Sequence, residues 1–142
     1  MRVTLEDIKV MFVVATGGLE GAKEAFDRLE ARLPSLKGRK FYGTYLNGEY
    51  RAGVALQADD DPASLGLETW VIPGGAFARR KMTNWSARIP EIGETFQAMA
   101  AEYPADPTRP SVEFYRSLKE LILFLPITLT PGSPVPPGRI ST

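Results

Sequence analysis

The sequence predicts an α+β fold in which two strand-helix-strand-strand units form one antiparallel sheet, with both helices on one face and a ligand cleft on the other. Two helical stripes of apolar residues have the same spacing, and a proline follows each. A Phe-Tyr pair comes after each stripe, and a stretch rich in β-forming residues precedes it. Because these features recur in the same order, we expect the two halves of the chain to fold alike.

The first unit begins with a β-rich stretch, Ile8 to Thr16, and continues with an amphipathic helix. The apolar residues of this helix are spaced 3, 4, 3, 4, as on one helical face: Leu19, Ala22, Phe26, Leu29 and Leu33. Pro34 ends the helix, because the residue before a proline disfavours helical backbone angles. Phe41 to Leu46 and Glu49 to Gln57 then form a hairpin around Asn47-Gly48, a typical two-residue turn.

The second unit repeats this order. Its β-rich stretch, Glu68 to Met82, is interrupted at Pro73-Gly74-Gly75, where we expect a bulge or a bend. The helix that follows has Pro90 in its first turn, Pro104 beyond its end and the same stripe: Ile89, Ile92, Phe96, Met99 and Tyr103. Phe114-Tyr115 then leads through the weaker turn Ser117 to Glu120 into the apolar strand Leu121 to Ile127.

The chain of 142 residues fits one domain, 1–127, built of repeats at about 8–57 and 68–127. The acidic segment Asp59-Asp60-Asp61-Pro62 is expected to link the two repeats. A proline-rich stretch closes the sequence, with Pro131, Pro134, Pro136 and Pro137. We therefore expect residues 128–142 to be an extended, flexible tail.

The composition excludes several classes of function. Lys plus Arg and Asp plus Glu both number 17, so the net charge is zero and nothing favours direct binding of nucleic acid. The chain has no Cys and no His, which excludes thiolate nucleophiles, a Ser-His-Asp triad and imidazole metal ligands. The run Asp59 to Asp61 lacks the spacing of a calcium loop, so we expect neither a metal nor a cofactor. The sequence has no signal-peptide pattern and no apolar run of about 20 residues, so we expect a cytoplasmic protein without a membrane partner.

Glu113 is the carboxylate on which the prediction of function depends. It stands between two apolar residues of a predicted strand, and it shares one face of that strand with Tyr115. The alternative is a solvated carboxylate, or one paired with Arg109 or Arg116. We favour a ligand pocket, because an acid in so apolar a setting is costly unless something satisfies or uses it. A desolvated Glu113 with a raised pKa would act as a general base toward water, whereas an ionised one would attract a cationic aromatic ligand.

A set of short motifs occurs in a fixed order along the chain: Tyr42-Gly43; Tyr50-Arg51-Ala52-Gly53; Ile72-Pro73-Gly74-Gly75 with Phe77; Trp85; Arg109-Pro110; Glu113-Phe114-Tyr115; and Leu125-Pro126-Ile127. Together they resemble the GyrI-like small-molecule-binding family, over roughly Ile8 to Ile127. Related domains are the effector-binding parts of multidrug-responsive regulators, which bind lipophilic, often cationic aromatic compounds. Some stand-alone members resemble hydrolases that open cyclopropane-bearing DNA-alkylating natural products, and the inhibitor that names the family acts on gyrase.

The resemblance implies a pocket between the two halves, with its glutamate at Glu113. Its aromatic walls map to Tyr42, Trp85 and Tyr115, and less directly to Trp70 and Phe77. Tyr42 and Tyr115 both end a Phe-Tyr pair, so a pseudo-twofold axis would set them across the pocket from each other. For Trp85 the alternative is a hydrophobic staple onto the second helix.

We therefore predict a stand-alone GyrI-like domain that binds a lipophilic aromatic small molecule, cations included, in an aromatic cleft floored by Glu113. The first alternative is a hydrolase in which Glu113 activates water to open a cyclopropane, while Tyr115 orients the water or donates to the leaving group. The second alternative is a protein-binding inhibitor of an enzyme such as gyrase.

Overall fold

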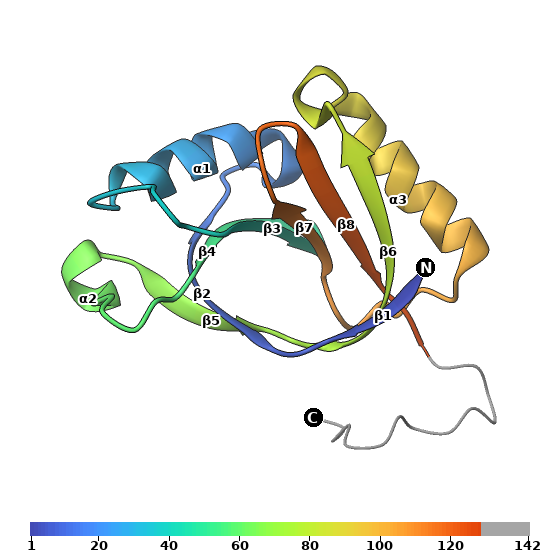
Figure 1. The fold of residues 1–142 in the computed structure, drawn as a ribbon, viewed down its shortest axis with the longest axis horizontal. Coiled ribbons are helices and arrows are strands. Elements are labelled where there is room, and N and C mark those ends of the chain that lie inside the picture. The colour runs from blue at the N-terminus through green and yellow to red at the C-terminus, as the bar shows by residue number, and fades with distance from the viewer. Residues whose placement is uncertain (129–142) are drawn as a thin grey trace.

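The two halves of the chain form one curled, eight-stranded antiparallel sheet with α1 and α3 on the same side (Figure 1). This computed structural model describes residues 1–128, so the predicted tail lies, apart from Thr128, outside the described residues. The strands are β1 (Arg2–Leu5), β2 (Ile8–Val14), β3 (Phe41–Leu46), β4 (Glu49–Ala55), β5 (Glu68–Ile72), β6 (Gly75–Thr83), β7 (Ser111–Tyr115) and β8 (Glu120–Pro126). The helices are α1 (Ala22–Ala31), the single turn α2 (Pro62–Leu65) and α3 (Pro90–Glu102), with 3₁₀ turns η1 (Gly18–Gly21) and η2 (Trp85–Ala87). The predicted α+β architecture of two strand-helix-strand-strand units is confirmed.

The strand order is β1-β6-β8-β7-β3-β4-β2-β5, and the central pair β7–β3 joins the two halves. The hairpin β3–β4 turns at Asn47 and Gly48, whose φ angles are 51° and 83°. Both lie in the left-handed region that a tight two-residue turn requires, as the Asn-Gly pair predicts. Pro90 opens α3, also as predicted.

The break at Pro73-Gly74 is larger than the predicted bulge or bend, because it separates two strands with different partners. β5 pairs with β2 at the edge of the first half, whereas β6 pairs with β8 in the second. The short strand β1, which the sequence pattern did not reveal, pairs with β6 at the opposite edge. The chain can turn so sharply here because Gly74 packs directly against the backbone of Leu5 and Glu6, where a Cβ would collide.

Arg109 holds this break in place. Its guanidinium donates to the carbonyl oxygens of Gly74, Ala76 and Ile127 at 2.8–3.2 Å and to Asp106 Oδ2 at 2.9 Å. It also lies 4.8 Å from the ring centre of Phe77. Because a guanidinium has five donors in a fixed plane, one side chain can satisfy all these acceptors. Arg109 is therefore engaged in holding the fold and is not paired with Glu113.

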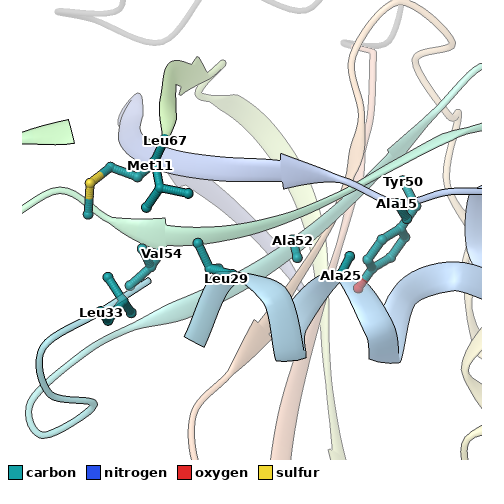
Figure 2. Close-up of a cluster of buried hydrophobic side chains, with 9 residues drawn as sticks. All are labelled: Met11, Ala15, Ala25, Leu29, Leu33, Tyr50, Ala52, Val54 and Leu67. Atoms are coloured by element: carbon teal, nitrogen blue, oxygen red, sulfur yellow. The ribbon is translucent and has the colours of Figure 1, made fainter. Parts of the chain in front are cut away.

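Two hydrophobic cores fill the space between the sheet and the helices. The first lies under α1 and contains Met11, Ala15, Ala25, Leu29, Leu33, Tyr50, Ala52, Val54 and Leu67, with Tyr50 at one end (Figure 2). The second lies under α3 and includes Met99 from the helix with Leu121, Leu123 and Leu125 from β8. Phe26 of α1 and Phe96 of α3 are only half-buried at the margins of these cores.

The opposite, concave face of the sheet has a core of its own. The curl of the sheet gathers its buried side chains into one cluster: Val10, Phe12, Ile72, Phe77, Val112, Ile122 and Phe124. Tyr42, Trp70 and Phe114 pack against this cluster. The centre of this face is therefore filled, and a hollow lies toward the β3–β4 turn.

The acidic segment between the two halves does more than link them. Asp60 forms a bidentate pair with Arg39, at 2.6 and 2.7 Å, and both side chains are 7% exposed. Asp61 caps α2 by accepting from the backbone N–H of Ser64. Within residues 1–128 no helix has the length and apolar character needed to cross a membrane.

Candidate functional site

Glu113 lies in the middle of β7, on the face of the sheet that carries α1 and α3. The antiparallel register sets it opposite Gly43 of β3 on one side and Leu123 of β8 on the other. Since paired residues point to the same face, Glu113 shares its face with Leu123, a member of the core under α3. The side chain is 6% exposed. A carboxylate so deeply buried needs partners to offset its loss of hydration.

Two tyrosines supply these partners. The hydroxyl of Tyr50 and the hydroxyl of Tyr115 each donate to Glu113 Oε1 at 2.6 Å. The two phenol oxygens lie 3.3 Å from each other. The three side chains come from β4 and β7, strands that are distant in sequence, and they form one compact hydrogen-bonded group, which we call the carboxyl–phenol cluster.

The second carboxyl oxygen of Glu113 is not used in the cluster. Both hydrogen bonds fall on Oε1, and no other described residue donates to Oε2. Within residues 1–128, no buried side-chain nitrogen or oxygen that is closed to solvent lacks a partner. Oε2 is therefore accessible to solvent, and it is the carboxyl oxygen available to a ligand or a water.

Gly43 provides the space in which the cluster fits. A Cβ at this position would collide with Tyr50 Oη and would lie 2.6 Å from Glu113 Oε1. The absence of a side chain lets the phenol and the carboxyl meet directly over the β3 backbone. Gly43 is thus a positioning residue for the cluster.

Aromatic rings from both helical regions cover the cluster. Phe26 of α1 lies edge-to-face on Tyr115 with 5.1 Å between ring centres, and Trp85 of η2 lies on the same ring at 5.0 Å. Phe26 also contacts the ring of Tyr50 at 6.3 Å. Phe26, Trp85 and Tyr115 are each only half-buried. The carboxylate therefore lies beneath a layer of rings that is itself partly open to solvent between α1 and α3.

The electrostatics of the cluster are those of an acid without a basic partner. Burial raises the pKa of the Glu113 carboxyl above its ordinary value, and the two phenol hydrogen bonds oppose that shift. Among the described residues no Lys or Arg pairs with Glu113: Arg109 binds Asp106, and Arg116 lies 3.7 Å from Glu120. Burial and the neighbouring carboxylate hold the pKa values of Tyr50 and Tyr115 well above their usual range. Both phenols are therefore proton donors here, and neither is a base.

The structure brings together only part of the predicted aromatic wall. Glu113, Tyr115 and Trp85 lie at the cluster, and the indole N–H of Trp85 donates to the carbonyl of Ser117 at 3.0 Å. The other predicted wall residues, Tyr42, Trp70 and Phe77, belong to the core of the concave face.

The predicted placement of Tyr42 across a pocket from Tyr115 is wrong. The register pairs Tyr42 with Phe114, on which it stacks at 5.0 Å, and pairs Tyr115 with Phe41. Because neighbouring residues of a strand alternate between faces, the two tyrosines lie on opposite faces of the sheet. Pro34 and Pro104 are 70 residues apart, as are Gly43 and Glu113, whereas the two Phe-Tyr pairs are 73 residues apart. The two spacings differ by three residues, an odd number, so the Phe-Tyr pair of β7 has its two faces exchanged relative to the pair of β3. This difference was the signal in the sequence that could have revealed the true arrangement.

Sequence reasoning missed Tyr50 and Gly43 as parts of the site. The hairpin register that follows from the Asn-Gly turn sets Tyr50 opposite Tyr45 and places it on the same face as Ala52. Those pairings could be read from the sequence. The pairing of β3 with β7, which brings Tyr50 to Glu113, could not. Within residues 1–128 no group of three or more His, Cys, Asp or Glu side chains could hold a metal ion.

Comparisons with known proteins identify similar folds but no family. No protein-family model matches the sequence, and no curated protein matches it. Among solved structures, an integron cassette protein from the mobile metagenome of Vibrio cholerae is similar, with a TM-score of 0.61 and 14% identity over 90% of this chain and 95% of that one. The protein SAV2435, solved bound to tetraphenylphosphonium, has a TM-score of 0.58 and 10% identity over 90% and 93%. A hydrolase from Listeria innocua has a TM-score of 0.55 and 14% identity over 90% and 91%. At these identities the likeness shows a shared fold.

Proposed function

We propose that this protein is a GyrI-like domain that binds lipophilic aromatic cations at the carboxyl–phenol cluster. The observation that carries the proposal is a carboxylate with 6% exposure whose hydrogen-bond partners are two neutral phenols. A buried acid with no counter-ion among residues 1–128 is a site that a cationic ligand can complete. That a protein of the same fold was solved with tetraphenylphosphonium supports this choice of ligand class.

The rings above the cluster suit such a ligand. Phe26 and Trp85 pack edge-to-face on the ring of Tyr115, whose hydroxyl donates to the carboxylate. Cations lie favourably against aromatic faces, and the benefit grows when water is excluded. Because Phe26 and Trp85 both pack edge-to-face on Tyr115, a bulky ligand would reach the carboxylate by turning one or more of these rings aside. The half-exposed Phe26 and Trp85 are the side chains best placed to move.

Binding of a cation should be linked to the ionisation of Glu113. Because burial raises the pKa of the carboxyl, Glu113 stays neutral up to a higher pH than an exposed glutamate does. A cationic ligand favours the ionised form, so its affinity should rise with pH through the range in which Glu113 titrates. A ligand of the same shape without positive charge should not show that rise.

The charge requirement can be tested with two ions of nearly the same shape, tetraphenylphosphonium and tetraphenylborate. Calorimetry should show saturable binding of the cation, weaker or no binding of the anion, and a loss of about tenfold or more in affinity for the cation in Glu113→Gln. Glu94→Gln, an exposed change of the same charge on α3, is the matched control and should bind as the parent does. Equal affinity for both ions, or an unchanged affinity in Glu113→Gln, would contradict the proposal.

A second candidate function, hydrolysis of cyclopropane-bearing alkylators, is favoured by Oε2 of Glu113, which accepts no hydrogen bond from residues 1–128. In this reaction a water attacks the strained ring carbon while Oε2 takes its proton, and the opened carbon–carbon bond passes its electron pair to the group that activates the ring. Tyr115 and Tyr50 would stay protonated and hold Oε1, so that Oε2 is the basic oxygen. A hydrolase of the same fold from Listeria innocua supports this alternative.

Product analysis separates the two functions. Incubation with a cyclopropane-bearing alkylator should leave the compound unchanged if the protein only binds it, and should yield the ring-opened water adduct if it is a hydrolase. Glu113→Gln would then bind the compound while losing turnover. If neither ligand binding nor turnover is found, the remaining candidate is a protein-binding inhibitor, to be tested by pull-down against purified gyrase.

A further inference from the structure

The concave face of the sheet has a hollow of about 410 Å³ on the side opposite the carboxyl–phenol cluster. Its lining includes Thr44, Leu46, Glu49, Arg51, Trp70 and Pro110. These residues come from both strands of the β3–β4 hairpin, from β5 and from the segment before β7, so the curl of the sheet makes the hollow. Sites for small molecules have volumes of roughly 300–1,000 Å³, so this hollow is large enough for one.

Arg51 is the charged group at the hollow. Its guanidinium carbon lies 4.5 Å from the ring centre of Trp70 and 4.6 Å from that of Phe12, so two aromatic rings fix the plane of the side chain. Its Nε donates to Glu49 Oε2 at 2.6 Å. Among the described residues nothing accepts from its two terminal nitrogens. An oriented pair of N–H donors with no acceptor is what a bidentate oxyanion contact requires.

Thr44 supplies a second polar group at the base of the same hollow. The residue is 4% exposed, yet its hydroxyl has no hydrogen-bond partner within residues 1–128. No buried side-chain oxygen of the described residues is both closed to solvent and without a partner, so this hydroxyl opens into the hollow. The register places Thr44 directly opposite Arg51 on the neighbouring strand. The hydroxyl and the guanidinium thus lie side by side on one face.

The remaining walls of the hollow are apolar. Trp70, Leu46 and Pro110 offer surfaces on which a flat ring can lie. Sites of this kind commonly combine a mostly apolar lining with a few polar groups that fix the orientation of the ligand. Here the polar groups are an arginine and a hydroxyl, both of which can donate to an oxyanion.

We propose that this hollow is a binding site for a small aromatic carboxylate, whose oxyanion is held by Arg51 and Thr44 and whose ring lies against Trp70. The site shares no side chain with the carboxyl–phenol cluster and takes a ligand of the opposite charge. Glu49 limits its affinity, because this carboxylate already occupies Nε of Arg51 and repels a second anion.

The two tryptophans of the chain allow each site to be observed by itself. Trp70 borders the hollow, and Trp85 lies over the cluster on the other face. In nitrogen–proton correlation spectra of the full chain, 2-naphthoate should shift the indole signal of Trp70 saturably and leave that of Trp85 in place. Tetraphenylphosphonium should do the reverse. Trp70→Phe and Trp85→Phe assign the two signals.

Three substitutions test the chemistry of the site. Arg51→Gln should weaken the binding of 2-naphthoate by about tenfold or more, and Thr44→Val, which keeps the shape of the side chain, should weaken it less. Glu49→Gln should strengthen it, because a competing carboxylate is removed. The uncharged analogue 2-naphthalenemethanol should bind weakly and respond little to Arg51→Gln or Glu49→Gln.

Three results would overturn this inference and leave the proposed function unaffected. The Trp70 signal would not move with 2-naphthoate, the affinity for naphthoate would be unchanged in Arg51→Gln, or that affinity would be weaker in Glu49→Gln. Thermal melts identify a variant that fails to fold, and Thr44→Val and Glu49→Gln then still decide the question. Failure of tetraphenylphosphonium to shift the Trp85 signal would count against the cluster alone.

Discussion

Tyr50 and Arg51 are consecutive residues of β4, and their side chains serve opposite faces of the sheet. Tyr50 donates to Glu113 beneath α1 and α3, while Arg51 lies between Phe12 and Trp70 on the concave face. Gly43 and Thr44 divide in the same way on β3, because strand residues alternate between faces. One hairpin therefore supplies side chains to both candidate sites, and substitutions at adjacent positions can test the two sites separately.

The stability of the protein should fall with rising pH through the ionisation of Glu113. The pKa of this carboxyl is raised in the folded state by burial, whereas the unfolded chain exposes it at its ordinary value. Its stabilising contribution is then fully present below the ordinary pKa and is lost as the pH rises through the folded-state pKa. Each unit of difference corresponds to about 1.4 kcal/mol.

Urea unfolding of the parent and of Glu113→Gln across pH 4 to 8 measures this effect. The difference between the two free energies of unfolding should change with pH in the direction just given. Groups such as Asp60 and Asp106, whose pKa values are lowered, titrate alike in both proteins and cancel in the difference. A difference that does not vary with pH would show that Glu113 has the same pKa in both states.

Removing either phenol hydroxyl should raise the pKa of Glu113 further, since both hydrogen bonds favour the ionised carboxylate. Tyr50→Phe and Tyr115→Phe should each cost about 1.5–3 kcal/mol of unfolding free energy where Glu113 is ionised. The double variant should not be additive, because both phenols donate to the same oxygen. Carbon-13 shifts of the carboxyl during a pH titration give the pKa. Tyr45→Phe, 40% exposed and outside the cluster, is the control and should leave it unchanged.

Gly43→Ala should disrupt the cluster, because the added methyl group would occupy the position of Tyr50 Oη. Overpacking of this kind typically costs about 1–3 kcal/mol. Gly93→Ala is the matched control: this glycine lies within α3 with open space around it, so alanine there should stabilise by about 0.5–1 kcal/mol. Thermal unfolding measures both. A Gly43→Ala protein as stable as the parent, with Glu113 titrating as before, would mean that the backbone adapts at no cost.

Breaking the Arg39–Asp60 pair should destabilise the fold far more than breaking an exposed pair. Arg39→Ala leaves a carboxylate with 7% exposure without its bidentate partner, at a cost of about 3 kcal/mol. Lys23→Ala removes a pair whose side chains are 91% and 61% exposed, and should cost less than about 0.5 kcal/mol. Because Arg39 lowers the pKa of Asp60, the contribution of the pair is lost as the pH falls. Denaturant midpoints at pH 7 and pH 3 compare the two variants, and equal losses would show that the buried pair adds nothing.

Patterns of short range were enough to predict much of this fold. The 3, 4, 3, 4 stripes, the prolines beyond them and the Asn-Gly turn predicted α1, α3 and the β3–β4 hairpin, and the structure has all three. The break at Pro73 was also predicted, but its consequence was not. Whether a break is a bulge within one strand or a passage between two strands depends on which strands pair at each side, and pairing partners are distant in sequence. For the same reason the short edge strand β1 was not predicted.

The candidate site divides along the same line. The sequence by itself determined that Glu113 and Tyr115 share one face of a strand, because side chains alternate between the two faces along a single strand. Only the tertiary structure decided that Tyr50 and Gly43 complete the site, that the site lies beneath α1 and α3, and that Tyr42 faces away from it. The physical reason is the register of the central β3–β7 pair. A change of one residue in a register exchanges the two faces of a strand, and no local pattern in either strand reports which register the folded sheet adopts.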